Sequence, residues 1–261
     1  MIQTLSILFP VRGAKSKVRQ KGAKMGLFDI FKSGPTKDSI LAQVSKAKEV
    51  YAQPDYRRMA MDKLLKWATP ESYAGLLERF TVVVQSPHWD ESEKRWLVEE
   101  FIKIGDSTLP ILREFILKKN EVNYALLAYQ KIASKKDYEN ILVEAIKVRP
   151  PSDHRSVQAK QELIAALDES QVAHLKDLLL PHLNDHSDDV QCAAILSLGK
   201  IDDVEVKDAL VKLLASEEHA PRVLRAVASI VVDQKIPLGD VKPVPVVLED
   251  FRIDSGHLAR L

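Results

Sequence analysis

Apolar positions recur every three or four residues along most of residues 37–233, and short polar breaks interrupt the pattern at regular intervals. This periodicity predicts a succession of helices. They are expected at residues 38–51, 55–68, 70–84, 91–104, 107–118, 121–133, 136–148, 154–167, 170–183, 187–200, 204–215 and 221–232. Start signals agree with these boundaries. Thr69 can cap a helix whose first residue is Pro70, and Asp90 stands before the helix at 91–104 with Glu93 three residues later. The pattern therefore predicts an all-α chain with short connections.

The predicted helices pair into about six units of similar length. Val157, Val190 and Val223 recur 33 residues apart, each near the start of the second helix of its pair. In such an array each pair buries its apolar face against the neighbouring pairs. In the helix at 187–200, the stripe expected to face the first helix consists of Val190, Ala193, Ala194 and Leu198. The repeat predicts an α-solenoid rather than a single globule.

A motif at residues 180–201 indicates the kind of repeat. It has a proline in the first helix, an aspartate in the turn, a valine and an alanine in the second helix, and a leucine-glycine pair at its end. These residues are Pro181, Asp185, Val190, Ala194, Leu198 and Gly199. The segment resembles the HEAT repeat in its short bacterial form, similar to the PBS-lyase-type repeat. The resemblance is strong over 106–233 and weak over 37–105, and it implies a right-handed α-solenoid of about six HEAT-like hairpins over residues 37–233.

One part of the HEAT pattern is missing from its usual place. The arginine that commonly follows the valine is replaced by Gln158, Gln191 or Leu224. We therefore expect the ladder of arginine contacts between successive repeats to be absent. The signatures of ankyrin and tetratricopeptide repeats are also missing from the sequence.

The two ends of the chain differ from the predicted array in composition. Residues 1–36 are predicted to be a basic, disordered arm, because residues 1–28 hold six of the 38 basic residues and no acidic one. Met25 begins a segment that looks like a natural start, so the presence of residues 1–24 in the mature protein is left open, as is a transit peptide. Residues 234–261 are predicted to form an extended tail that could pack on the solenoid.

Charge and composition narrow the class of protein. The chain after residue 28 holds 32 basic and 37 acidic residues, which disfavours nucleic-acid binding. The single Cys192 excludes a disulfide framework and is typical of a cytoplasmic protein. No apolar run approaches the ~20 residues needed to cross a bilayer, so we expect no stable membrane insertion. Docking at a membrane surface through residues 25–32 stays an alternative.

An apolar strip on the second helices is the candidate binding surface. Cys192, Ile195 and Leu196 lie off the predicted core stripe, and Leu163 is placed similarly one repeat earlier. Such a strip, in a concave groove lined by the second helix of each repeat, would bind a peptide or a helix. Nearby arginines could orient an acidic partner. The predicted protein-binding residues are Ile195, Leu196, Cys192, Leu163, Arg155, Arg222 and Arg225.

Two alternatives to a binding groove stay open for this strip. The proline-rich segment 236–248 could lie along it as an extended tail, so that the chain covers its own apolar surface. The strip could also belong to the core, because the faces of a buried helix are hard to assign from periodicity alone.

The sequence predicts a non-catalytic scaffold or adaptor that binds another protein, with no cofactor and no metal. His154, His186 and His219 are expected in successive turns about 10 Å apart, too far to share one zinc ion. No histidine is followed by glutamate, whereas the iron-binding HEAT enzyme deoxyhypusine hydroxylase needs His-Glu pairs. The apolar neighbours of Cys192 favour packing over nucleophilic catalysis. The alternative is an enzyme or enzyme subunit on a HEAT-like scaffold, of DNA-repair glycosylase or lyase type.

Overall fold

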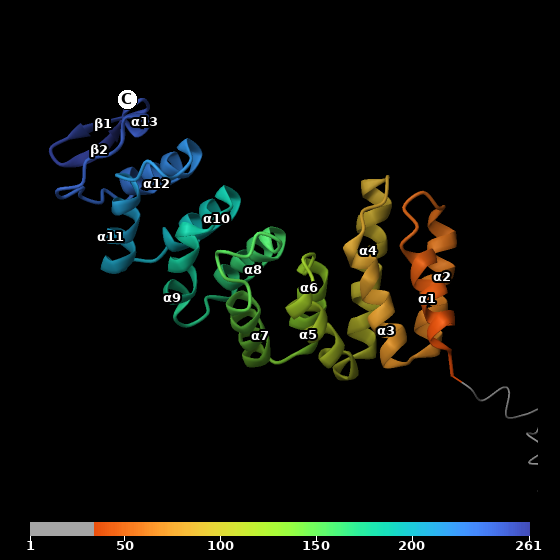
Figure 1. The fold of residues 1–261 in the computed structure, drawn as a ribbon. Coiled ribbons are helices and arrows are strands. Elements are labelled where there is room, and N and C mark those ends of the chain that lie inside the picture. The colour runs from red at the N-terminus through yellow and green to blue at the C-terminus, as the bar shows by residue number, and fades with distance from the viewer. Residues whose placement is uncertain (1–33) are drawn as a thin grey trace, which may run out of the picture. The chain divides into compact units, whose positions relative to one another are not determined.

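A computed structural model describes residues 34–261, and helices dominate this part of the chain (Figure 1). Every helix predicted from periodicity has a counterpart. The helices are α1 (Lys37–Ala47), α2 (Pro54–Trp67), α3 (Pro70–Leu77), α4 (Pro87–Ile104), α5 (Leu109–Lys118), α6 (Asn123–Ile132), α7 (Lys135–Lys147), α8 (Val157–Ser170), α9 (Leu175–Leu179), α10 (Asp188–Leu198), α11 (Val204–Leu213), α12 (Pro221–Asp233) and α13 (Pro245–Leu248). The interpretations of residues 1–24 and 25–32 lie outside the described residues.

Three 3₁₀ segments modify the expected helices: η1 (Glu78–Thr81), η2 (Asp106–Thr108) and η3 (Leu180–Asn184). The largest departure is at the helix predicted over 170–183. There α8 continues to Ser170, α9 is only five residues long, and the chain then passes into η3. Pro181 lies in η3 and has no N–H to donate to a helical hydrogen bond, so the α-helix does not run on.

The helices pack as two sets, which we call first and second helices. The first helices α1, α3, α5, α7 and α9 contact one another in succession, and so do the second helices α4, α6, α8, α10 and α12. Hairpin partners such as α5 with α6, α7 with α8, and α11 with α12 join the two sets. Each helix therefore buries its apolar face against sequence neighbours, as expected for a repeat array.

Local sequence signals position the helices. Thr69 and Ser72 form a reciprocal capping box at the start of α3, and the Asp203 side chain accepts from the backbone N–H groups of Glu205 and Val206 at the start of α11. Gly199 ends α10 where that helix meets α12. A Cβ at Gly199 would lie 2.6 Å from Ile230 Cδ1, so a larger residue here would require the Ile230 side chain to move.

The C-terminal segment departs from the prediction of an extended tail. It contains α13 and an antiparallel pair of strands, β1 (Phe251–Asp254) and β2 (His257–Arg260), in which Phe251 faces Arg260. Both β2 and α13 pack on α12. The apolar side chains of the segment are buried: Ile236, Leu238, Val244, Val247, Phe251 and Leu258. The segment thus covers the last helix of the array instead of running back along the second helices.

The seam around α10 gives a stability prediction. Ala194 is fully buried, so we expect Ala194→Leu to overpack the contact and lower the free energy of unfolding by about 1–3 kcal/mol. The matched control is Ala165→Leu on the exposed side of α8, which we expect to change stability little. Thermal denaturation of both variants measures the difference, and an equal Tm for the two would show that Ala194 is not in a packed seam.

Candidate functional site

The predicted strip on α10 is split between the surface and the core. Leu196 is 59% exposed and Cys192 is partly exposed, whereas Ile195 is fully buried. Leu163 on α8 is fully buried as well. The prediction that Ile195 and Leu163 line an exposed groove is therefore wrong, because both side chains belong to the core. We call Cys192 and Leu196, with the exposed residues of α8 and α12 beside them, the second-helix surface.

An error in the assumed repeat register accounts for the misplacement of Leu163. The buried positions of α10 are Val190, Gln191, Ala194, Ile195, Ser197 and Leu198. Those of α8 are Ala159, Lys160, Leu163, Ile164 and Leu167. All five buried positions of α8 have a buried counterpart in α10 at an offset of 31 residues rather than 33, although 33 does relate the buried positions of α12 to α10. Val157, taken as the equivalent of Val190, is the first residue of α8 and is only partly buried.

The corrected register reveals a polar ladder that the sequence did not predict. At the corrected offset Ala159 corresponds to Val190, and Lys160 corresponds to Gln191. Lys160 therefore takes the position at which an arginine commonly follows the valine of the HEAT pattern. Its Nζ atom lies 2.6 Å from Asp185 Oδ2 in the next turn, and both side chains are 0% exposed. One step further, Gln191 donates from Nε2 to the Asp185 carbonyl, and its Oε1 lies 3.0 Å from His219 Nδ1. A ladder of contacts between repeats is therefore present, with lysine and glutamine in the place of the usual arginine.

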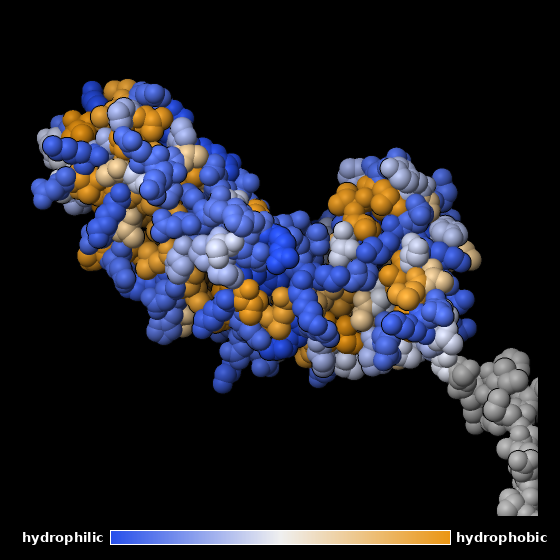
Figure 2. Space-filling view, viewed as in Figure 1, coloured by the Kyte–Doolittle hydropathy of each residue, from blue (hydrophilic) through white to orange (hydrophobic). Residues whose placement is uncertain are grey.

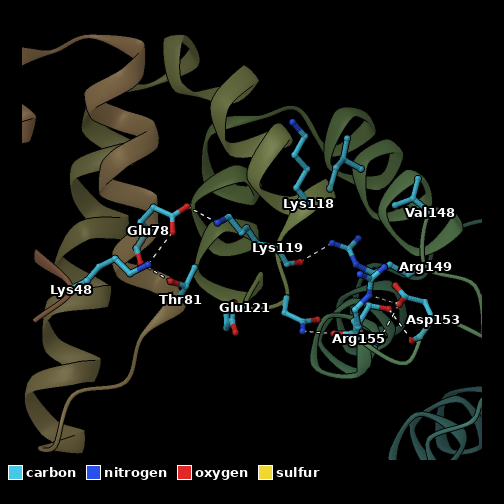
Figure 3. Close-up of a pocket in the computed structure, with 13 residues that line it drawn as sticks. Lys48, Glu78, Thr81, Lys118, Lys119, Glu121, Val148, Arg149, Asp153 and Arg155 are labelled. Carbon is cyan, nitrogen blue, oxygen red and sulfur yellow. Dashed lines mark hydrogen bonds and ion pairs between the residues drawn. The ribbon is translucent and has the colours of Figure 1, made fainter. Parts of the chain in front are cut away.

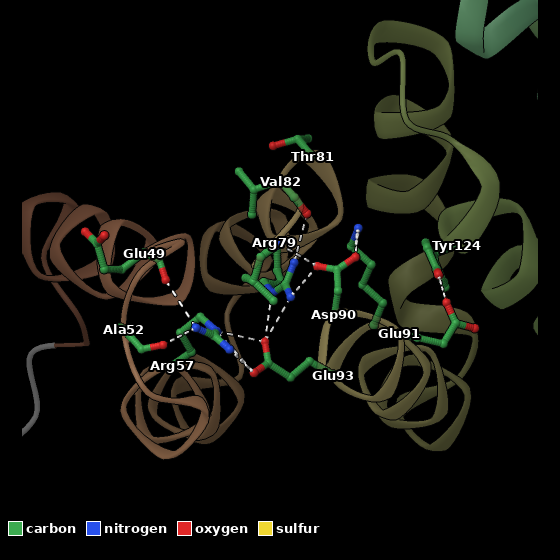
Figure 4. A network of polar contacts seen from close by, with 12 residues as sticks. Glu49, Ala52, Arg57, Arg79, Thr81, Val82, Asp90, Glu91, Glu93 and Tyr124 are labelled. Atoms are coloured by element: carbon green, nitrogen blue, oxygen red, sulfur yellow. Dashed lines mark hydrogen bonds and ion pairs between the residues drawn. The ribbon is translucent and has the colours of Figure 1, made fainter. Parts of the chain in front are cut away.

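A second buried network joins the N-terminal helices (Figure 4). Arg57 of α2 binds Glu93 of α4, with Nη2 to Oε1 at 2.7 Å. Arg79 of η1 binds two acids of α4, at 2.8 Å to Asp90 Oδ1 and 3.0 Å to Glu93 Oε2. Lys94 Nζ lies 2.7 Å from Asp90 Oδ2. Burial raises the pKa of Asp90, but hydrogen bonds from Lys94 and Arg79 outweigh it and hold the pKa below its usual value.

Two of the three arginines predicted to bind a partner form ion pairs with acidic residues of the chain itself. Arg222 contacts Asp188 and Asp189 on α10, with Nη2 to Asp189 Oδ1 at 2.5 Å. Arg225 contacts Glu249 and Asp250 just after α13. These two arginines thus hold neighbouring elements together.

Arg155 lies elsewhere, in the turn between α7 and α8. Its side chain is 97% exposed, and its nearest acid, Asp153, is 3.9 Å away. The structure therefore does not bring the three arginines together on the second-helix surface.

Leu196 remains uncovered by the C-terminal segment. The segment packs on α12, and Leu196 keeps its high exposure with that segment in place. Apolar side chains form small, separate patches among polar ones on the face shown in Figure 2. An exposed leucine on a second helix is thus a feature that the chain's own packing leaves available.

A polar pocket lies along the turns between first and second helices (Figure 3). Lys48 and Lys119 both contact Glu78, and the Arg149 guanidinium donates to the carbonyls of Ala145, Ile116 and Lys119. These are contacts within the protein, so these charged side chains of the pocket already have hydrogen-bond or ion-pair partners. Sequence reasoning missed it because its residues come from turns far apart in the chain.

The same row of turns brings two histidines together. The ring centroids of His154 and His186 are 3.9 Å apart, so the expected separation of about 10 Å between histidines of successive turns is wrong for this pair. The cause is the turn before α8, whose Pro151 carbonyl lies 3.1 Å from His186 Nδ1. His219 lies in the next turn, against Gln191.

Two further features are absent from residues 34–261. No helix there is long and apolar enough to span a bilayer. No group of three or more His, Cys, Asp or Glu side chains in that range is arranged to hold a metal ion.

Comparison with known proteins identifies part of the array. Residues 149–231 match the family described as HEAT repeats. No curated protein matches the chain. No solved structure matches it either. The matched region contains α8, α10 and most of α12, and therefore the second-helix surface.

The Lys160–Asp185 pair gives a test of the ladder. Lys160→Ala leaves the Asp185 carboxylate buried without its cation, and we expect a loss of about 3–5 kcal/mol in the free energy of unfolding. Lys200→Ala is the control, since Lys200 pairs with Asp168 at the surface and its loss should cost less than about 1 kcal/mol. Denaturant titration of both variants measures the two losses, and similar unfolding midpoints for the two variants would contradict the assigned role of Lys160.

Cys192 gives a test that depends on pH. Burial raises the pKa of its thiol, and the nearby Arg222 offsets this only in part. The reactive thiolate is therefore scarcer at neutral pH than in an ordinary cysteine with a pKa of about 8.5. We expect alkylation by iodoacetamide to reach half its maximal rate at a higher pH in the folded chain than in the same chain in denaturant. A lower pH in the folded chain would indicate an activated nucleophile and support an enzyme.

Proposed function

This chain is a HEAT-repeat protein over residues 149–231, and on that basis we propose that it is a cytoplasmic, non-catalytic scaffold that binds another protein through the second-helix surface. We further propose that the array is right-handed and has about six repeats. The observation that carries the proposal is Leu196, a 59% exposed leucine on the second helix of a matched repeat. Side chains of successive second helices share one surface in such arrays, which suits an extended or helical partner segment.

We propose different roles for the predicted residues. Leu196 would supply the apolar contact, with Cys192 four residues earlier on the same face of α10. Ile195 and Leu163 support the surface from the core. Arg222 would keep α10 and α12 aligned through its bonds to the α10 aspartates.

The partner is proposed to be a protein rather than a nucleic acid. After residue 28 the chain holds five more acidic than basic residues, so its field does not favour a polyanion. Two of the three predicted arginines are engaged by acids of the chain itself, which lowers the positive charge available to any partner. Binding through an apolar contact should therefore depend little on salt.

The experiment compares the wild-type chain with Leu196→Glu in capture from a lysate of the source organism. A charge at the centre of an apolar contact should remove the partner, and with the purified partner we expect a loss of about 2 kcal/mol, or roughly thirtyfold in Kd. The control is Val204→Glu, because Val204 is 75% exposed but lies on α11, a first helix. Equal capture by both variants would place the binding site elsewhere, and loss with the Val204 variant alone would reverse the proposed face.

A further inference from the structure

His186 is held in one tautomer by the turns around it. Its Nδ1 atom lies 3.1 Å from the Pro151 carbonyl and 3.1 Å from Asp185 Oδ1. The Pro151 carbonyl can only accept a hydrogen bond, and Asp185 Oδ1 also accepts one from the Ser187 N–H. The proton of a neutral His186 is therefore on Nδ1, and the lone pair of Nε2 is left free.

Asp185 is placed as the supporting carboxylate of a metal-binding histidine. It is 1% exposed and is held by Lys160 at 2.6 Å and by His182 at 3.2 Å, so its position is fixed by the core. Histidines that bind metals commonly donate their second ring N–H to a carboxylate or a backbone carbonyl, which orients the ring and raises its basicity. His186 makes both kinds of contact at once.

His154 supplies a second imidazole from the preceding turn. Its ring is in contact with that of His186, at 3.9 Å between centroids and an interplanar angle of 61°. Among the described residues it has this ring contact and no hydrogen bond, and it lies at the surface. Its ring can therefore turn without breaking other interactions.

We propose that His154 and His186 together bind a divalent transition-metal ion of the zinc and nickel type. Imidazole nitrogens suit these ions, and two bonds of about 2.1 Å to a tetrahedral ion place the nitrogens roughly 3.4 Å apart. The ring centroids are 3.9 Å apart, and rotation of the exposed His154 ring would turn one of its nitrogens towards His186. Water occupies the remaining positions, so the ion exchanges with solvent.

Such an ion connects two repeats. His154 lies in the turn before α8, and His186 lies between η3 and α10. A bond to each turn adds a link to the Lys160–Asp185 contact between the same two repeats. The ion therefore acts by stiffening consecutive repeats, which is separate from the proposed binding of a protein.

The test is calorimetric titration of the untagged full chain with ZnCl₂ and with NiCl₂. We expect one ion per chain, and a loss of at least about tenfold in affinity in both His154→Ala and His186→Ala. His219→Ala is the control, since His219 occupies the next turn and contacts Gln191, and we expect its affinity to equal that of the wild type.

A second readout separates metal binding from damage to the fold. Zn²⁺ should raise the Tm of the wild type and of His219→Ala and leave that of His154→Ala unchanged, because an ion that binds only the folded chain stabilises it. His154 is exposed, so His154→Ala should keep the wild-type Tm without metal. Absence of binding in the wild type, or unchanged binding in His154→Ala, would overturn the proposal. Loss of binding in His219→Ala would overturn it as well, because the ion would then lie elsewhere.

Discussion

Asp185 joins three parts of the array at a single buried carboxylate. Its oxygens contact Lys160 from α8, His182 from η3, and the backbone N–H of Ser187 just before α10. A charge without solvent must keep its partners, because an unpaired buried carboxylate costs several kcal/mol. This contact joins α8 to the turn that precedes α10, beside the apolar seam between the two helices.

The N-terminal half also has buried charges that are paired between neighbouring helices, but with different residues. Arg57, Arg79 and Lys94 surround Glu93 and Asp90, so that α2, η1 and α4 share one set of buried charges. Direct packing between α2 and α4 is sparse compared with that between later second helices, and the arginines fill the space between them. This region lies outside the matched HEAT repeats, in the part of the chain where the sequence resemblance is weak.

The helices could be predicted from the sequence because their signals are local. Apolar periodicity, Pro70 after Thr69, and Asp203 before α11 all act within one helical turn. The buried charges could not be predicted, because Lys160 and Asp185 are 25 residues apart and Arg57 and Glu93 are 36 apart. Hydrophobic spacing treats such residues as surface positions.

The exposed residues of α10 were predicted only in part, because their burial also depends on contacts with distant parts of the chain. Helix α10 is packed by η3, α8 and α12, so its buried arc is wider than the single stripe that periodicity suggests. Ile195 falls within the wider arc and Leu196, its neighbour, falls outside it. Whether a residue of α10 is buried or exposed depends on where the neighbouring helices pack, and periodicity within one helix does not show where they pack.

The strands at the C-terminal end determine where the array can grow. A helix at the end of a stacked array presents an apolar face on which another helical pair could add, and α12 has that face occupied by α13 and β2. The outer side of the strands is mostly polar, and each strand has only four residues. Short, polar edges are poor templates for pairing with another chain. A second copy could stack on this face of α12 only after α13 and β2 had left it.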